Sequence, residues 1–219
     1  SNTGSYNTSV GSNALNANTS GQRNVAFGYG ANQTNTTGNN NNALGYNALL
    51  YNTTGSNNNA IGSNSLVNNT TGNNNNALGY YALNRNSTGI NNTAVGQSAL
   101  EKNTSGSNNN AFGFYSLNSN STGWYNTGFG GNTLYGNTTG RYNTAIGRWA
   151  LYHNLTGNHN TAIGNYAGVA PGSSNLENTT AIGDSALVTT SNTIQLGNPS
   201  VTNVKTAGNI TAGSVIYPN

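Results

Sequence analysis

The stretch from Thr54 to Thr70 reads Thr-Gly-Ser-Asn-Asn-Asn-Ala-Ile-Gly-Ser-Asn-Ser-Leu-Val-Asn-Asn-Thr, and its pattern recurs along most of the 219-residue chain. The period is 17 residues, and glycines equivalent to Gly62 recur ten times without a slip. They are Gly11, Gly28, Gly45, Gly62, Gly79, Gly96, Gly113, Gly130, Gly147 and Gly164. A second glycine column contains Gly55, and a leucine column contains Leu66. A fixed period this short predicts a solenoid, in which each repeat is one coil stacked on the previous one.

Composition alone predicts the opposite, a disordered chain. Asn makes up more than a fifth of the residues, only 4% are charged, and the mean hydropathy is −0.55. Such polar, low-complexity chains usually bury too little apolar surface to offset their conformational entropy. A disordered tract, however, has no reason to keep three residue columns in register over ten repeats. We therefore predict a folded all-β chain.

The charge pattern and the residue types restrict the function classes. The net charge of +3 comes from six scattered Lys and Arg residues against three acids, so the basic isoelectric point of about 9.2 reflects few acids and no basic patch. We therefore expect no nucleic-acid binding, which needs clustered phosphate contacts. The chain has no Cys and no Met, which excludes disulfides and thiolate chemistry. No stretch approaches the roughly 20 apolar residues of a membrane helix, so we expect no direct membrane span.

Each coil is predicted to contain two short strands joined by Gly and Asn turns. In the quoted repeat these are Asn58–Gly62 and Ser65–Leu66, because Gly, Asn and Thr are poor helix formers and no 3.6-residue stripe is present. Ala60 and Ile61 are adjacent, so in a strand they point to opposite faces. Either the aliphatic column or the alanine column is therefore outside. Two apolar faces in so polar a chain favour an obligate oligomer, with a monomer as the alternative.

Asparagine forms two regular columns. One precedes the first strand and comprises Asn7, Asn24, Asn41, Asn58, Asn75, Asn92, Asn109, Asn126, Asn143 and Asn160. The other precedes the Thr-Gly turn and comprises Asn18, Asn35, Asn52, Asn69, Asn86, Asn103, Asn120, Asn137 and Asn154. Stacked coils lie about 4.8 Å apart, so these amides can hydrogen-bond from coil to coil. Asn also tolerates left-handed turn conformations, and we expect both roles.

The second asparagine column carries a further, weaker signal. Each of its members, from Asn18 to Asn154, starts an Asn-x-Thr/Ser triplet, which is formally a glycosylation sequon. Such triplets arise by chance in an Asn- and Thr-rich repeat. Glycosylation would produce a regular stripe of sugars along the rod.

The 17-residue register ends after Gly164, which divides the chain into three parts. We predict a regular β-roll over residues 1–169, an insertion loop over 170–180, and irregular coils over 181–219 that form a cap or a transition to a following segment. The alternating residues of 200–205 and 208–216 are typical of strands. The chain starts in mid-repeat and has no terminator after Asn219, so we expect a mature protein or a fragment whose native form continues.

Three motifs carry a resemblance to a known family. The motifs are Asn-Thr-Ala-Ile-Gly at 143–147 and 160–164, Asn-Ala-Leu-Gly-Tyr-Asn-Ala-Leu at 42–49, and the repeated Asn-Thr-Thr-Gly. They resemble the head repeats of trimeric autotransporter adhesins and related bacterial and phage tail-fibre-like proteins. The resemblance covers about residues 1–197. It implies a left-handed parallel β-roll, packed as a homotrimer, on a surface-exposed fibre that attaches to matrix, cells or sugars. The adhesin repeat is nearer 14 residues, which this chain matches only from Gly183 to Gly197.

No catalytic constellation is present. The acids are Glu101, Glu177 and Asp184, and the two histidines, His153 and His159, flank one turn. General acid–base catalysis needs several such groups to converge. We therefore expect no enzyme activity, no catalytic residue, no cofactor and no metal, although a surface metal contact at the histidines is conceivable.

Aromatic residues concentrate in the C-terminal coils, at positions that the repeat leaves variable. The candidate ligand-binding residues are Trp124, Tyr125, Tyr135, Tyr142, Trp149, Tyr152 and Tyr166. Exposed rings among amides suit sugar binding, with the rings stacked on pyranose faces. The alternative is that the rings pack across neighbouring coils or between subunits.

Three functions follow as alternatives. The first is a structural, adhesive fibre segment that is extracellular, on a cell surface or on a virion fibre, whose partners are copies of itself and a host-surface, matrix or glycan ligand. The second is a carbohydrate-binding module that uses the aromatic residues. The third is an ice-binding solenoid, since a threonine column is regular, although its members lie in turns. That column comprises Thr37, Thr54, Thr71, Thr88, Thr122 and Thr139.

Overall fold

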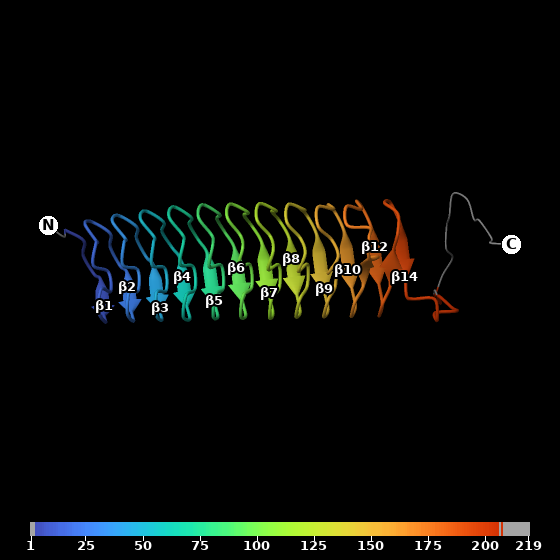
Figure 1. Cartoon of the computed structure of the whole chain (residues 1–219), viewed down its shortest axis with the longest axis horizontal. Coiled ribbons are helices and arrows are strands. Elements are labelled where there is room, and N and C mark those ends of the chain that lie inside the picture. Colours follow the sequence, from blue (N-terminus) through green and yellow to red (C-terminus); the bar gives the residue numbers. More distant parts are fainter. Residues whose placement is uncertain (1–2, 206, 208–219) are drawn as a thin grey trace.

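The chain forms a long rod of stacked coils. The computed structural model describes residues 3–205 and 207, which form a parallel β-solenoid of about 11 coils of about 17 residues. The coils follow one another from the N-terminal to the C-terminal end (Figure 1). No residue in this described part lies in a helix, so none of it provides a helix that could cross a membrane. The solenoid expected from the 17-residue period is confirmed.

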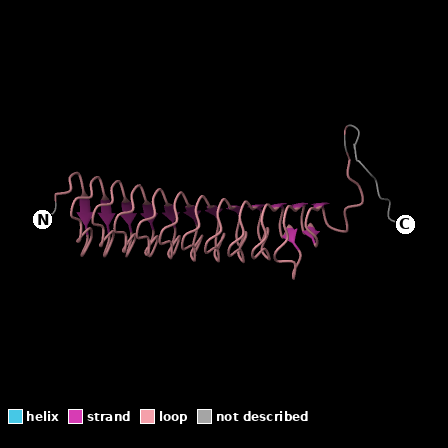
Figure 2. Cartoon of the chain, turned by 90° about the horizontal axis from the view of Figure 1, so that it is seen from above, coloured by secondary structure: helices cyan, strands magenta, loops and turns pink. Residues whose placement is uncertain are grey.

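Each regular coil contributes one three-residue strand to a single sheet. The strands are β1 (Thr8–Val10), β2 (Val25–Phe27), β3 (Asn42–Leu44), β4 (Asn59–Ile61), β5 (Asn76–Leu78), β6 (Thr93–Val95), β7 (Asn110–Phe112), β8 (Thr127–Phe129), β9 (Thr144–Ile146), β10 (Thr161–Ile163), β11 (Gly168–Val169), β12 (Thr180–Ile182), β13 (Leu187–Val188) and β14 (Ile194–Leu196). Twelve of them pair in parallel in sequence order, and β11 pairs with β13 in a second small sheet. The strand row follows one long side of the rod (Figure 2).

The period fixes the register of the sheet. Ala60 pairs with Ala43 on one side and with Ala77 on the other, so identical positions stack along the rod. Gly62 ends its strand at a φ of 129°, and a Cβ there would lie 2.7 Å from the Gly79 carbonyl oxygen of the next coil. The invariant glycine is therefore required both by its backbone conformation and by the close approach of the next coil.

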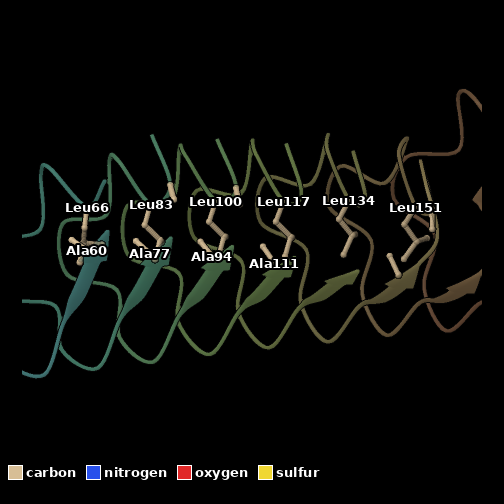
Figure 3. Packing of buried hydrophobic residues seen from close by; sticks show 14 of the residues in the cluster. Ala60, Leu66, Ala77, Leu83, Ala94, Leu100, Ala111, Leu117, Leu134 and Leu151 are labelled. Carbon is tan, nitrogen blue, oxygen red and sulfur yellow. The ribbon is translucent and has the colours of Figure 1, made fainter. Parts of the chain in front are cut away.

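The core of each coil is formed by two side chains that face each other. Ala60 points inward from the strand, and Leu66 points toward it from the opposite wall, and both are fully buried (Figure 3). The same pair recurs along the rod in a single hydrophobic cluster. The solenoid interior is thus only one alanine and one leucine thick.

The outer side of the sheet carries the second apolar column. Ile61, adjacent to Ala60, is 43% exposed, and most of the strands repeat this pattern of a half-buried, a buried and an exposed residue. Of the two arrangements that the sequence allowed, the structure therefore has alanine inside and the aliphatic side chain outside.

The predicted second strand of each coil is wrong. Ser65 and Leu66 lie in a turn, and Leu66 has a φ of 52° with Asn64 at 57°. L-residues other than Asn rarely adopt this left-handed backbone conformation. Its alternation along the turn curves the backbone and brings the leucine into the core. Among the described residues, the wall opposite the main sheet contains strands only at β11 and β13.

Both asparagine columns form hydrogen-bonded ladders inside the rod, as predicted. Asn86 Nδ2 donates to Asn69 Oδ1 at 2.9 Å and to the Gly89 carbonyl at 3.0 Å. In the other ladder, Asn58 Oδ1 accepts from the backbone N–H of Asn75 at 3.0 Å. The left-handed asparagines belong to other columns, for example Asn57 and Asn64. The two roles expected for Asn are therefore divided between different positions.

The regular register ends at β10, after which the coils change. Residues 171–176 form the turns of the insertion, and the sheet continues through β12 and β14. The strand expected at 200–205 is absent, since residues 201–205 have no regular structure. The strand pattern expected at 208–216 lies outside the described residues.

One position in the leucine column is occupied by a polar residue and predicts a stabilising substitution. Asn32 is fully buried between the positions of Leu15 and Leu49, and neither Nδ2 nor Oδ1 has a hydrogen-bond partner. Its φ of 47° matches the left-handed conformation that Leu15 and Leu49 also adopt. An unpaired buried polar group costs about 1–3 kcal/mol.

We expect Asn32→Leu to raise the free energy of unfolding by about 2 kcal/mol, because removing two unpaired groups outweighs the roughly 1–2 kcal/mol cost of a left-handed leucine. Urea denaturation followed by circular dichroism measures this change. Asn16→Ala, at an exposed asparagine, is the control and should change stability by less than about 0.5 kcal/mol. A destabilised Asn32→Leu variant would contradict this interpretation of the core.

Candidate functional site

The seven candidate aromatic residues do not form one site. Trp124, Tyr125 and Tyr142 contact one another, whereas Tyr135, Trp149, Tyr152 and Tyr166 belong to a second set of ring contacts. Within residues 3–205 and 207, no ring contact joins the two sets. We call the first set the turn cluster and the second the groove cluster.

The turn cluster follows the second glycine column and is a ladder of stacked rings. Tyr125 and Tyr142 are parallel within 1°, with their centroids 5.3 Å apart, and His159 continues the stack 4.9 Å from Tyr142. Trp124 packs edge-on against Tyr142 at 4.8 Å, and the Arg141 guanidinium lies 5.2 Å from the Trp124 centroid. Since a sugar stacks on the face of a ring, and these faces cover one another, the cluster is better suited to packing.

The groove cluster lies outside the strands, beyond the bends at Gly147 and Gly164. Tyr135 and Tyr152 stack at 5.3 Å, and the Trp149 and Tyr166 rings are 6.3 Å apart and nearly perpendicular, at 88°. His153 Nε2 and the Tyr166 hydroxyl form a 2.9 Å hydrogen bond. Three of these rings meet at an open cavity, because they do not all stack in one direction.

That cavity is the strongest candidate site. It has a volume of about 220 Å³ and is lined by Trp149, Tyr152 and Tyr166. The Arg148 guanidinium lies 3.6 Å from the centre of the Trp149 ring. Sequence reasoning included the three lining rings but missed Arg148. The available signal was its position next to Trp149 in the sequence, where an arginine can pack on the indole ring.

The sequon asparagines lie inside the rod. Asn52 and Asn69 are fully buried, and Asn69 Nδ2 donates to Asn52 Oδ1 at 2.8 Å and to the Gly72 carbonyl at 2.9 Å. Glycosylation attaches a bulky sugar to this nitrogen, so in the folded coil it would replace both bonds. Glycosylation of this column stays a prediction, and a mass above that of the unmodified chain would be its signature.

The two threonine columns of the turn differ in their contacts. Thr53 Oγ1 donates to the Thr70 carbonyl at 2.9 Å, whereas Thr54 in the neighbouring column is exposed. The column of Thr54 is exposed throughout, whereas the threonines in the column of Thr53 are half-buried except at Thr19 and Thr104. The turn therefore lacks the two continuous exposed rows of a flat Thr-x-Thr surface.

The titratable side chains are dispersed. Glu177 accepts a hydrogen bond from Asn158 at 2.8 Å, and Asp184 accepts one from Asn165 at 3.0 Å. His153 and His159 belong to different aromatic clusters. The described part of the chain contains no group of three or more acid, histidine or cysteine side chains that could hold a metal ion.

Comparisons with known proteins add no assignment, since the chain matches no protein-family model, no curated protein and no solved structure.

The ring stack of the turn cluster predicts a contribution to stability. Tyr142 contacts three rings, those of Trp124, Tyr125 and His159. Since an aromatic pair contributes about 0.5–1.5 kcal/mol, we expect Tyr142→Ala to lower the free energy of unfolding by about 1–3 kcal/mol in urea denaturation.

Tyr51 is the matched control, since it is 49% exposed, compared with 42% for Tyr142, and makes no ring contact within the described residues. Tyr51→Ala should cost less than about 0.5 kcal/mol. Equal effects of the two substitutions would show that the stack does not stabilise the rod.

Proposed function

We propose that this chain is a structural segment of an extracellular or surface-exposed fibre that mediates attachment, and that its sheet face is covered by further copies of the chain. The observation that carries the proposal is the outward apolar column of the main sheet, which contains Ile, Leu, Val and Phe. Phe27, Ile61, Phe129 and Ile146 are 57%, 43%, 45% and 42% exposed. Contiguous apolar surface of this kind marks an interaction face in soluble proteins.

The length of the column supports burial between subunits. Twelve strands contribute to the sheet, and at about 4.8 Å per step the column extends for about 53 Å. The core behind it is built mainly from alanine and leucine, with Val169 and Val188 at the C-terminal coils. Association would therefore add substantially to the apolar area that the thin coil buries alone, at roughly 25 cal/mol per Å².

The chemistry of the face suits a second copy better than a charged partner. The outward positions of the twelve strands include no charged residue, and beside the apolar column they carry Asn or Thr except at Val25 and Ile194. Asn42 Nδ2 donates to Asn59 Oδ1, and Asn59 Nδ2 to Asn76 Oδ1, both at 2.7 Å. These amides are already hydrogen-bonded to one another within the chain. A partner that docks on this face would therefore make mainly apolar contacts with it.

We propose a homotrimer, the arrangement that the resemblance to trimeric autotransporter adhesin heads implies. Side-by-side packing of three rods would cover the three apolar columns and leave the turns and the groove cluster facing outward. Attachment would then depend on the variable side chains of those outer surfaces. A cell surface or a virion fibre is the corresponding location.

Carbohydrate binding is the second candidate function. The cavity between Trp149, Tyr152 and Tyr166 favours it, because aromatic walls pack on the apolar faces of sugar rings. It lies outside the strands of the main sheet, so it is compatible with a fibre whose sheet faces are buried.

Light scattering tests the assembly. We expect the wild-type chain to have about three chain masses and Ile146→Glu to dissociate the assembly, because a buried carboxylate without a partner is strongly unfavourable. Circular dichroism establishes that the variant keeps its β-structure.

Ile90→Glu is the matched control, since Ile90 is 39% exposed and lies outside the strands. It should leave the mass unchanged. A wild-type mass of one chain would contradict the proposal, as would equal dissociation by both substitutions.

A further inference from the structure

We propose that the cavity of the groove cluster binds a pyranose ring that bears a carboxylate, with the sugar ring against Tyr152 and Trp149 and the carboxylate on Arg148. The inference rests on the second candidate function, carbohydrate binding, and is independent of the fibre assembly. It adds the ligand class and two residues, Arg148 and His153, to the rings that line the cavity.

The cavity exists because a regular column ends there. Tyr135 and Tyr152 stack at 5.3 Å, but the next residue of their column is Val169, which belongs to β11 and is buried. No third ring follows, so the stack ends at Tyr152. The Tyr152 ring lines the cavity, which provides the stacking surface that rings inside a ladder lack.

In two earlier coils the position equivalent to Tyr152 carries an amide that bridges to a neighbouring coil. Asn84 and Asn118 precede Tyr152 in its column, and their Nδ2 atoms donate to the backbone carbonyls of Asn64 and Ser98 at 2.9 and 3.0 Å. A tyrosine ring cannot make this short bridge. The ring at Tyr152 therefore leaves open a space that the amide spans in the coils of Asn84 and Asn118.

The dimensions of the cavity indicate a single ring. Its volume of about 220 Å³ is below the roughly 300–1,000 Å³ of sites for drug-sized ligands. The planes of Trp149 and Tyr166, two of the three lining rings, meet at 88°. Perpendicular walls enclose one ring on its face and its edge, and do not continue as a flat platform for a long polymer.

The positive charge that packs on Trp149, one of the rings that line the cavity, favours an acidic ligand. The Arg148 guanidinium lies 3.6 Å from the Trp149 centroid, and within residues 3–205 and 207 no carboxylate pairs with it. The acid of its column, Asp184, instead accepts from Asn165 and Ser185. The guanidinium fork is suited to bidentate binding of a carboxylate.

The polar rim suits hydroxyl groups. His153 Nε2 and the Tyr166 hydroxyl are 2.9 Å apart, and both atoms can donate or accept according to the histidine tautomer. Sugar hydroxyls also act both ways, so this pair can exchange hydrogen bonds with them.

The same rings could form a cage for a quaternary ammonium, but Arg148 opposes that ligand. Its guanidinium already occupies a face of Trp149 in a cation–π contact, and a second cation would be repelled. A carboxylated sugar makes use of both the rings and this charge.

The experiment compares methyl β-glucuronide with methyl β-glucoside by NMR titration of the wild-type chain; the two sugars differ only at C6, where a carboxylate replaces the hydroxymethyl group. We expect the glucuronide to bind at least about tenfold more tightly. Arg148→Gln should remove this preference and retain glucoside binding, since the ring surfaces remain. Tyr152→Ala should weaken both ligands.

Trp124→Ala is the matched control, because Trp124 belongs to the turn cluster, and it should change neither affinity. Equal affinity of the wild type for the two sugars would overturn the inference while the carbohydrate-binding candidate stands. If neither sugar binds, both the inference and the carbohydrate-binding candidate are overturned. Choline is titrated as a third ligand, and its binding in the absence of sugar binding would overturn both as well. The mass measured by light scattering reports separately on the fibre proposal.

Discussion

Hydrogen bonding from coil to coil by buried asparagine amides is the constraint on which the rest of this rod depends. The interior is too thin for a large apolar core, so its polar groups must be paired within it. An amide carries both donors and an acceptor, so each Asn can donate to one neighbour and accept from the next. Asn69 does both, donating to Asn52 at 2.8 Å and accepting from Asn86 at 2.9 Å. A carboxylate could only accept, and a leucine could do neither.

The ladders explain why the columns are invariant. A fixed rise of about 4.8 Å brings each side chain against its equivalent in the next coil. A residue type is therefore tolerated in a column only if it can pack against, or hydrogen-bond with, a copy of itself. Asn, Ala and Leu meet this requirement in the core, and Gly meets it where backbones approach closely, as at Gly62. Asn32 departs from the rule and is left with two unpaired atoms. Specificity is therefore confined to the outer, variable positions.

The period and the asparagine columns were sufficient to predict the solenoid and its internal ladders. They were not sufficient to orient Ala60 and Ile61, because alternation in a strand distinguishes two faces without saying which is inside. The leucine segment was misassigned because a left-handed leucine is rare, whereas in the rod Leu66 has a φ of 52° and is held by burial in the core and by a backbone hydrogen bond to the Ala82 carbonyl. The aromatic residues were identified individually, but their division into two clusters depends on where the chain bends within a coil.

Hydrogen exchange of the asparagine side-chain amides, followed by NMR, tests this account most directly. If the ladders hold the coils together, the Nδ2 protons of Asn69 and Asn86 will exchange as slowly as the backbone N–H of Leu83, which donates to the Ala99 carbonyl at 3.0 Å. The Nδ2 protons of the exposed Asn16 give the reference for a free amide. Exchange of the ladder amides at the rate of Asn16 would contradict the central role of the asparagine ladders.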